Sequence, residues 1–386
     1  MKNLQNKWFF GGSKKKEYYH VFTTSSKSST WKTGNWKGNN FNNYEILVID
    51  SYDNSVRYTL TTSLQDWIMP PIDLSSFIGD AQIWIDNKET DIDEVYLWDA
   101  NINITYYNTG VFPRLRKIAM YSYTAITHFS GSINNLEHFE TYICDLRDLD
   151  FSYTTKMKYF RMYGNAKINV PINLNNNYLL ETFALDSASY PQYVFTPQNH
   201  PNLKYLTIRS NTLTSLSSSI NNSIFPNLLE LKLITTNYIS ADFNVSNVTT
   251  INTLYLKCNS ISGLSSLVNL KNLDFEYTGA NTNISFSSLV NLETMVIRAL
   301  ANYIIDLKPL IKLKSFSLLY TVYPNLTTVD IKNGLNNQIT LFQKLYDSKS
   351  VNVIVDNPIN AEAGISPYVT SVWKKWYTTY EVLKFI

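Results

Sequence analysis

The sequence predicts a curved α/β solenoid, in which a repeated short strand builds a parallel β-sheet. A β-rich module precedes the sheet and a small α/β cap follows it. Three observations predict this fold class. One pattern of apolar residues recurs through more than half of the 386 residues, its centre has the period of a strand, and it is lost toward both ends of the chain. The predicted domains are residues 1–88, 89–325 and 326–386.

The N-terminal module lacks the repeat but contains segments of strand length. Residues 18–24, 44–50 and 56–62 alternate between apolar and polar or run apolar. The last two segments flank a turn at Asp53 and Asn54, so we expect a hairpin there. We expect this module either to cap the solenoid or to dock it to an assembly.

The repeat organises the middle of the chain. The segments that begin at Leu203 and Ile251 align without a gap, with apolar residues at positions one, four, six and eleven, Asn at nine and Leu at fourteen. The pattern starts at eleven positions, on average about 22 residues apart: Ile92, Leu115, Leu136, Met157, Leu180, Leu203, Leu228, Ile251, Leu270, Leu292 and Leu313. Positions four and six, separated by one outward residue, indicate a short strand. Since one unit cannot close a core alone, we expect neighbouring units to stack.

These repeats resemble the leucine-rich repeats. The stretch Ile261-SGLSSLVNLKNLDF is most similar to the short repeats of internalin-type bacterial proteins, and the resemblance covers about residues 90–325. It departs from the family's pattern at position nine, where Asn occurs only as Asn165, Asn211 and Asn259. The resemblance implies that positions three, five and seven of each strand face a concave surface. It also implies that the asparagine ladder of the family is broken in this chain.

The C-terminal residues predict a cap of alternating helices and strands. Apolar residues at helical spacing indicate a helix near residues 339–346, and residues 351–355 have the composition of a buried strand. A second helix is expected to start at Ser366 as its N-cap, followed by a last strand over residues 381–386.

Composition excludes several classes of protein. The net charge of +2 leaves no basic surplus for a nucleic-acid-binding protein. Two cysteines cannot form a disulfide framework, and no stretch approaches the roughly 20 apolar residues of a membrane span. The first residues carry no apolar run of the length that a secretory signal needs. Uncharged polar residues replace charged ones, with 44 Asn and 28 Tyr.

No motif with catalytic or metal-binding spacing is found. The sequence has no Gly-rich phosphate loop, nucleophile elbow or His-Glu-x-x-His, and its four histidines fall in separate segments. We therefore expect a non-enzymatic protein without a metal or a cofactor. Cys144, at position nine of its repeat, is predicted to be buried. The acidic residues between Asp86 and Glu94 could offer oxygen ligands to calcium, but they match no known loop, so a solvated edge is favoured.

The outward positions of the first four repeats carry aromatic residues. Position seven holds Trp98, Tyr121, Tyr142 and Tyr163 in succession. With neighbours from position five, the predicted ligand-binding residues are Tyr96, Trp98, Tyr121, Glu140, Tyr142, Arg161 and Tyr163, here called the aromatic strip. Aromatic rings suit stacking on sugars or anchoring a protein interface, and Glu140 and Arg161 could bond hydroxyls or an acidic sugar. The alternative is a ladder that only stabilises the sheet.

These observations favour a recognition protein that binds a glycan or a surface protein through the concave face. The missing secretion signal favours a phage tail or fibre component, located in the virion and assembled in the host cytoplasm. In that case residues 1–88 would contact other virion proteins. The alternatives are a bacterial cell-surface adhesin and an intracellular leucine-rich-repeat scaffold. We expect no nucleic-acid or membrane partner, and homo-oligomer formation stays open.

Overall fold

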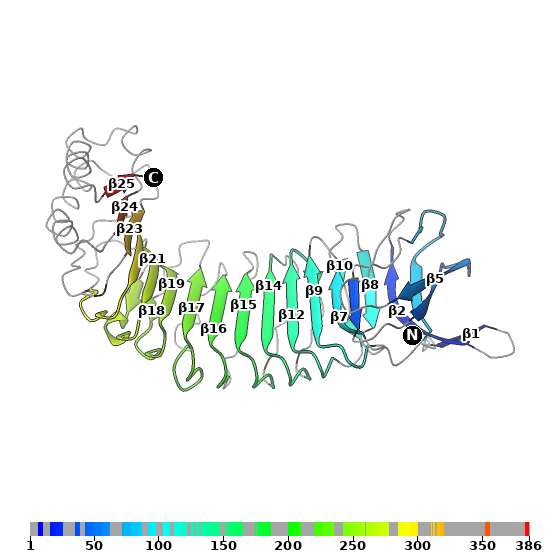
Figure 1. Ribbon diagram of the computed structural model, residues 1–386, viewed down its shortest axis with the longest axis horizontal. Coiled ribbons are helices and arrows are strands. Elements are labelled where there is room, and N and C mark those ends of the chain that lie inside the picture. Colours follow the sequence, from blue (N-terminus) through cyan, green and yellow to red (C-terminus); the bar gives the residue numbers. More distant parts are fainter. Residues whose placement is uncertain are drawn as a thin grey trace. The chain divides into compact units, whose positions relative to one another are not determined.

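The fold is described from a computed structural model of the chain (Figure 1). The structure describes residues 7–10, 16–25, 35–38, 43–61, 72–86, 92–97, 103–108, 112–121, 125–126, 129–130, 133–146, 151, 153–164, 174, 176–186, 200–209, 220–234, 242–258, 260–277, 285–299, 310, 312, 315–319, 352–355 and 383–385. The chain divides into two compact units, Met1–His200 and Pro201–Ile386. Parallel strands stack in each unit, so the chain is a parallel β-solenoid, and the first unit also holds the antiparallel strands of the N-terminal module.

Parallel repeat strands form the main sheet of the first unit. They are β7 (Ile92–Leu97), β9 (Lys117–Tyr121), β12 (His138–Tyr142), β14 (Tyr159–Tyr163) and β15 (Thr182–Asp186). Position three of each repeat lies beside position three of the next, as in the pairs Lys117↔His138 and His138↔Tyr159. The predicted repeat register is therefore confirmed for these strands.

A second sheet joins the N-terminal module to the opposite side of the repeats. It contains β13 (Asp145–Leu146), β10 (Ala125–Ile126), β8 (Asn103–Asn108), β2 (Lys16–Thr24), β6 (Ala81–Ile85), β4 (Asn43–Ile49) and β5 (Ser55–Thr61) in that order, with β1 (Lys7–Phe10) on β2 and β11 (Phe129–Ser130) on β8. The predicted strands over residues 18–24, 44–50 and 56–62 correspond to β2, β4 and β5, and the last two form the expected hairpin.

The N-terminal module contacts both sheets of the first repeats. Strand β3 (Asn35–Gly38) pairs antiparallel with β7, and β2 pairs antiparallel with β8. These pairings cover the edge that the first repeat would otherwise expose on each sheet.

The second unit continues the same repeat. Its parallel strands are β16 (Tyr205–Arg209), β17 (Glu230–Ile234), β19 (Thr253–Cys258), β21 (Asn272–Tyr277), β22 (Thr294–Ala299), β23 (Ser315–Leu319), β24 (Asn352–Val355) and β25 (Leu383–Phe385), and β18 (Asp242–Asn244) pairs with β20 (Ser260–Ser262). Strands β24 and β25 fall where the C-terminal cap was predicted to have strands. The helices predicted near residues 339–346 and from Ser366 lie outside the described residues.

Within the described parts of the connections between strands, the chain forms turns and almost no helix. The regular helix there is limited to the 3-10 turn η3 (Leu264–Ser266), so the predicted α/β class does not hold for the part of the chain that the structure describes. Successive tight turns are seen before β22: the amide of Leu292 donates to the carbonyl of Leu289, and the amide of Leu289 donates to the carbonyl of Phe286. Every third side chain is thereby buried. No helix in the described residues could cross a membrane.

The core of the first unit is rich in stacked aromatic rings. Phe139, Phe160 and Phe183 occupy position four of neighbouring repeats, with ring centroids 5.5 and 5.3 Å apart. Phe151 meets two of them edge-on. Cys144 is buried among the core residues, as predicted.

A polar ladder runs through the same core. Thr154, Asn177 and His200 fall three residues before position one in consecutive repeats, where later repeats carry apolar residues, and all three are buried. The Asn177 amide donates to the backbone carbonyl and hydroxyl of Thr154 at 2.6 and 2.7 Å, and a ring nitrogen of His200 lies 3.3 Å from the Asn177 carbonyl. These bonds compensate the Asn177 amide nitrogen and the Thr154 oxygens for the loss of water, whereas the side-chain Oδ1 of Asn177 is buried without a hydrogen-bond partner among the described residues.

Asparagines also link repeats at a position that the sequence pattern did not single out. Asn135, Asn227, Asn269 and Asn291 directly precede position one, and each donates to a backbone carbonyl one repeat earlier at 2.7 to 3.1 Å. These asparagines form a ladder at the entry to the strands, whereas Asn165, Asn211 and Asn259 at position nine lie outside the described residues.

Candidate functional site

The aromatic strip lies on the outward positions of β7, β9, β12 and β14. In β12 and β14 the side chains at positions four and six are buried, whereas those at positions three, five and seven reach the surface. In β9 positions three and seven reach the surface, but Ala119 at position five is buried. Strand pairing places Tyr121, Tyr142 and Tyr163 in one row and Glu140 beside Arg161 in the next. A third row holds Lys117, His138 and Tyr159. Trp98 lies outside the described residues.

Rings on adjacent strands stack face to face. The Tyr142 and Tyr163 rings have centroids 4.5 Å apart and planes 2° from parallel, and His138 and Tyr159 stack at 4.2 Å and 6°. This follows from the strand spacing of about 4.8 Å, which equals the separation of stacked rings. Within each pair the facing ring surfaces are therefore closed. Tyr142 is 39% exposed.

Glu140 lies at the centre of the three rows and binds groups from each. Its Oε2 accepts the Tyr121 hydroxyl at 3.0 Å and lies 3.5 Å from His138 Nε2, while its Oε1 lies 3.5 Å from Arg161 Nη1. The contact with His138 lowers the pKa of Glu140, and the Tyr121 hydroxyl and Arg161 add to this against the opposing effect of burial. Burial and the Glu140 charge raise the pKa of Tyr121 to about 12. Glu140 is thus an ionised anchor for its neighbours.

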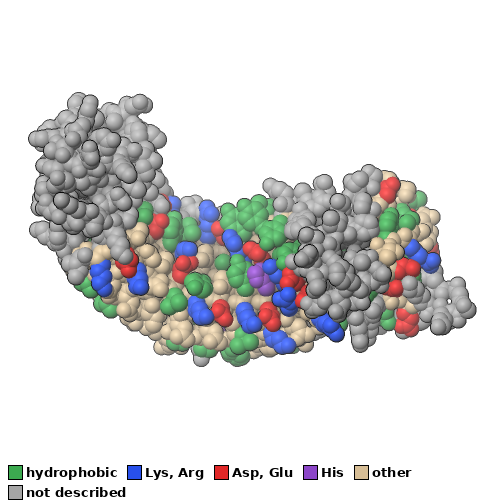
Figure 2. Space-filling model, in the orientation of Figure 1, with side chains coloured by type: hydrophobic (Ala, Val, Ile, Leu, Met, Phe, Trp, Pro, Cys, Tyr) green, Lys and Arg blue, Asp and Glu red, His purple; other side chains and the backbone are tan. Residues whose placement is uncertain are grey.

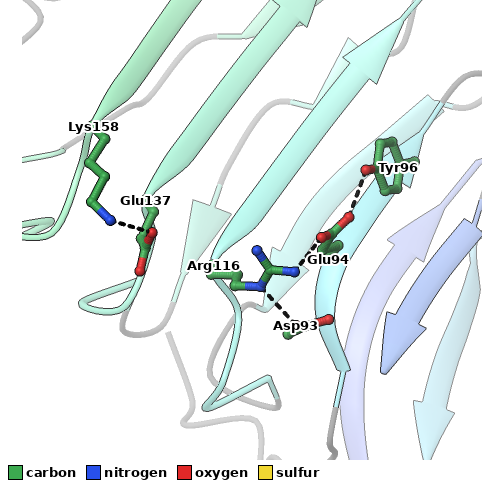
Figure 3. A network of polar contacts seen from close by, with 6 residues as sticks. All are labelled: Asp93, Glu94, Tyr96, Arg116, Glu137 and Lys158. Carbon is green, nitrogen blue, oxygen red and sulfur yellow. Dashed lines mark hydrogen bonds and ion pairs between the residues drawn. The ribbon is translucent and has the colours of Figure 1, made fainter. Parts of the chain in front are cut away.

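A separate polar network links the starting ends of neighbouring strands (Figure 3). Arg116 donates to Asp93 at 2.8 Å and to Glu94 at 2.6 Å, and Glu94 accepts the Tyr96 hydroxyl at 2.6 Å. Burial, followed by the Glu94 contact, raises the pKa of Tyr96 well above its usual range. The ammonium of Lys117 lies 5.0 Å from the centre of the Tyr96 ring. Tyr96 is therefore tied to this network rather than to the Glu140 cluster.

A further ion pair lies at the starting ends of the next strands. Figure 3 shows the Lys158 ammonium pointing at Glu137, and the two are 2.9 Å apart. Acidic and basic side chains are interspersed over the visible face of each unit instead of being sorted by sign (Figure 2). Charges on this surface largely compensate one another at close range.

The structure thus brings together five of the seven predicted strip residues: Tyr121, Glu140, Tyr142, Arg161 and Tyr163. The predicted set omitted His138 and Lys117, which border the same cluster. Both occupy position three of their repeats, and the predicted pattern already placed His138 at this outward position without including it among the ligand-binding residues.

The second unit offers a different outward surface. Lys232 pairs with Glu230 at 2.8 Å on the same strand, and Lys257 pairs with Glu276 at 2.7 Å across β19 and β21. Glu276 is buried although it lies at an outward position. These side chains form local ion pairs and no stacked aromatic row is described there.

Among the described residues, no group of three or more His, Cys, Asp and Glu side chains could hold a metal ion. In the acidic run, Asp93 and Glu94 bind Arg116. Cys144 and Cys258 are both buried, and neither forms a disulfide.

Comparison with known proteins adds no relative. No protein-family model matches the chain, and no curated protein matches it significantly.

Proposed function

We propose that this chain is a non-enzymatic recognition protein of leucine-rich-repeat type that binds a protein partner through the outward face of β9, β12 and β14. The observation that carries the proposal is the row of stacked tyrosines, Tyr142 and Tyr163, beside the exposed guanidinium of Arg161. Rigid aromatic rings and arginines are the side chains that most often anchor protein interfaces. The repeat spacing of about 22 residues supports the leucine-rich-repeat type.

The geometry of the rings favours a protein over a glycan. A sugar ring inserted between two tyrosines would need centroids about 7–8 Å apart, twice the usual contact distance, whereas Tyr142 and Tyr163 are 4.5 Å apart. The hydroxyls of the pair suit hydrogen bonds, and the ring surface left outside the stack suits apolar contacts. A partner with acceptor groups along one line would match this row.

Arg161 supplies the charge of the face. Nearly half of its side chain is exposed, 45%, and its contact with Glu140 is long at 3.5 Å. A carboxylate of the partner could therefore approach the guanidinium from solvent. Glu140 holds Tyr121 and Arg161 in place, so the face is ordered before binding and less conformational entropy is lost.

A matched pair of double variants tests this function. Tyr142→Ala/Tyr163→Ala removes the stacked row. Tyr153→Ala/Tyr178→Ala removes two tyrosines that are 70% and 53% exposed but lie on the turns. Both variants and the wild type are screened on a panel of host-surface proteins and on a glycan array, with thermal unfolding measured in parallel.

We expect protein binding by the wild type and the turn variant, and loss of binding by the row variant at unchanged melting temperature. Binding to glycans alone, lost in the row variant, would replace the protein partner by a sugar. Equal binding by all three would remove this face from consideration. The virion location belongs to the same proposal, and mass spectrometry of purified phage particles and of bacterial surface fractions distinguishes it from the adhesin alternative.

A further inference from the structure

Strand β5 ends the second sheet of the first unit. The sheet order runs from β8 through β2, β6 and β4 to β5, and Figure 1 shows β5 on the side of β2 away from β8. All seven residues of β5 pair with β4 without a bulge. Among the described residues, no strand pairs with the other edge of β5.

The turn between β4 and β5 fixes which backbone groups point away from the sheet. The amide of Asp53 donates to the carbonyl of Asp50, Asp53 has a φ of 61°, and the amide of Asp50 donates to the carbonyl of Asn54. Asp50 and Asn54 are therefore the first hydrogen-bonded pair of the antiparallel ladder. Hydrogen-bonded and non-hydrogen-bonded pairs alternate along such a ladder, so the backbone groups of Val56 and Tyr58 bond to β4. The backbone groups of residues 55, 57, 59 and 61 then point outward.

Strand β5 differs sharply from its neighbour in exposure. Ser55, Val56 and Arg57 are exposed, although the residues of β4 that they pair with, Ile49, Val48 and Leu47, are buried. Thr59 is exposed as well. Proteins commonly protect an edge strand with Lys, Pro, a bulge or an unpaired charge. Residues 55–61 contain no Lys or Pro, and the single Arg57 is paired with Glu45 on β4 at 3.5 Å. The edge is thus long, regular and largely uncharged.

We propose that β5 pairs with β5 of a second copy of this chain, in an antiparallel arrangement with a two-fold axis at Tyr58. The outward residues 55, 57, 59 and 61 are placed symmetrically about Tyr58, so this register uses all of them on both chains. It puts Arg57 opposite the partner's Thr59. A register shifted one way would oppose the two Arg57 side chains, which is unfavourable, and shifted the other way would leave Ser55 without a partner.

The expected dimer is weak. One strand pair of this length forms about eight hydrogen bonds but buries less than the roughly 1,200 Å² typical of a stable interface. We therefore expect a concentration-dependent equilibrium with a dissociation constant in the micromolar range or above. A closed pair with one two-fold axis uses up both edges, so it does not extend into a fibre.

Sedimentation velocity of the full chain between about 1 and 200 μM tests the association. We expect the mass to rise from 44.5 kDa toward twice that value with concentration, and the dimer fraction to fall at least tenfold in Thr59→Pro. This proline removes an outward amide that β4 does not use, which an edge strand tolerates. Thr59→Lys serves the same purpose should the proline variant unfold. A wild type that stays monomeric at the highest concentration would overturn the proposal.

Disulfide trapping tests the register independently. In the proposed pair the two Tyr58 Cα atoms lie about 4.5 Å apart, which a disulfide can span, whereas the two Ser55 positions are about 20 Å apart. Tyr58→Cys should therefore form a covalent dimer under mild oxidation and Ser55→Cys should not. The native thiols of Cys144 and Cys258 are buried and leave the background low. Equal trapping at both positions would mean random collision and would refute the pairing.

Discussion

Replacement of Asn177 by aspartate tests the polar ladder in the core of the first unit. The Asn177 side chain is fully buried, and its amide nitrogen donates to two oxygens of Thr154 at 2.6 and 2.7 Å. In Asn177→Asp a carboxylate oxygen would face those same two acceptors. An uncompensated buried charge costs about 3–5 kcal/mol, so we expect the free energy of unfolding to fall by about 4 kcal/mol at pH 7.5.

Asn177→Leu is the matched comparison. Later repeats carry Phe225, Val248 and Leu267 at this position, so the fold accepts an apolar side chain there. The Thr154 carbonyl then loses a bond at a cost of about 1–3 kcal/mol, while the leucine gains about 1.5–3 kcal/mol from burial. The two effects nearly cancel, and we expect a net change within about 1.5 kcal/mol.

Urea unfolding at pH 7.5 and pH 5 separates the contributions. In the aspartate variant burial raises the pKa of the new carboxyl, and the protonated group can again donate to Thr154. The native state then binds more protons than the unfolded state, so the loss relative to wild type should shrink as the pH falls. An aspartate variant that loses less than about 1 kcal/mol, at both pH values, would refute the assignment of Asn177 as a buried donor.

Three further changes probe other parts of the fold. Burial lowers the pKa of His20 to about 4, against a backbone hydrogen bond that raises it. The unfolded chain therefore binds more protons below pH 6.5, and urea titrations should show about 3 kcal/mol lost between pH 7 and pH 4, a loss largely absent in His20→Gln. Gly263 has a φ of 79° and an added Cβ would lie 2.4 Å from the backbone nitrogen of Ser246, so Gly263→Ala should cost about 3 kcal/mol in denaturant unfolding. Gly164→Ala, whose nearest atom is a side-chain carbon at 3.1 Å, should cost about 1–2 kcal/mol. Asn227→Ala loses the 2.7 Å hydrogen bond to the Pro201 carbonyl of the previous repeat. Urea unfolding should show a free energy of unfolding about 1 kcal/mol lower, and a much larger loss would contradict the exposed position of this bond.

The repeat strands could be predicted because their pattern is local. Leu231 and Leu233 are buried on either side of the outward Lys232, as an alternation with the period of a strand requires. The same alternation located the outward tyrosines. The pairing of equivalent positions then follows from stacking units of nearly equal length.

The contacts within the site could not be predicted in the same way. Tyr121 and Glu140 are 19 residues apart, and whether the hydroxyl reaches the carboxylate depends on side-chain rotamers. The stacking of Tyr142 on Tyr163 likewise closes ring faces that the sequence pattern left open for a sugar. The polar residue Asn177 at a core position has no meaning in a hydrophobicity pattern until its partner on the previous repeat is known.

The antiparallel pairing of β3 with β7 has a consequence for how long this molecule can be. Parallel stacks offer the same edge at each step, so an uncovered first repeat could template another solenoid and polymerise end to end. Strand β3 is four residues long, runs against β7 and shifts register at its end. It therefore presents a mismatched surface to an incoming copy. A second copy of the chain therefore cannot continue the parallel sheet from this end, and the stack of repeats in the first unit ends at β3.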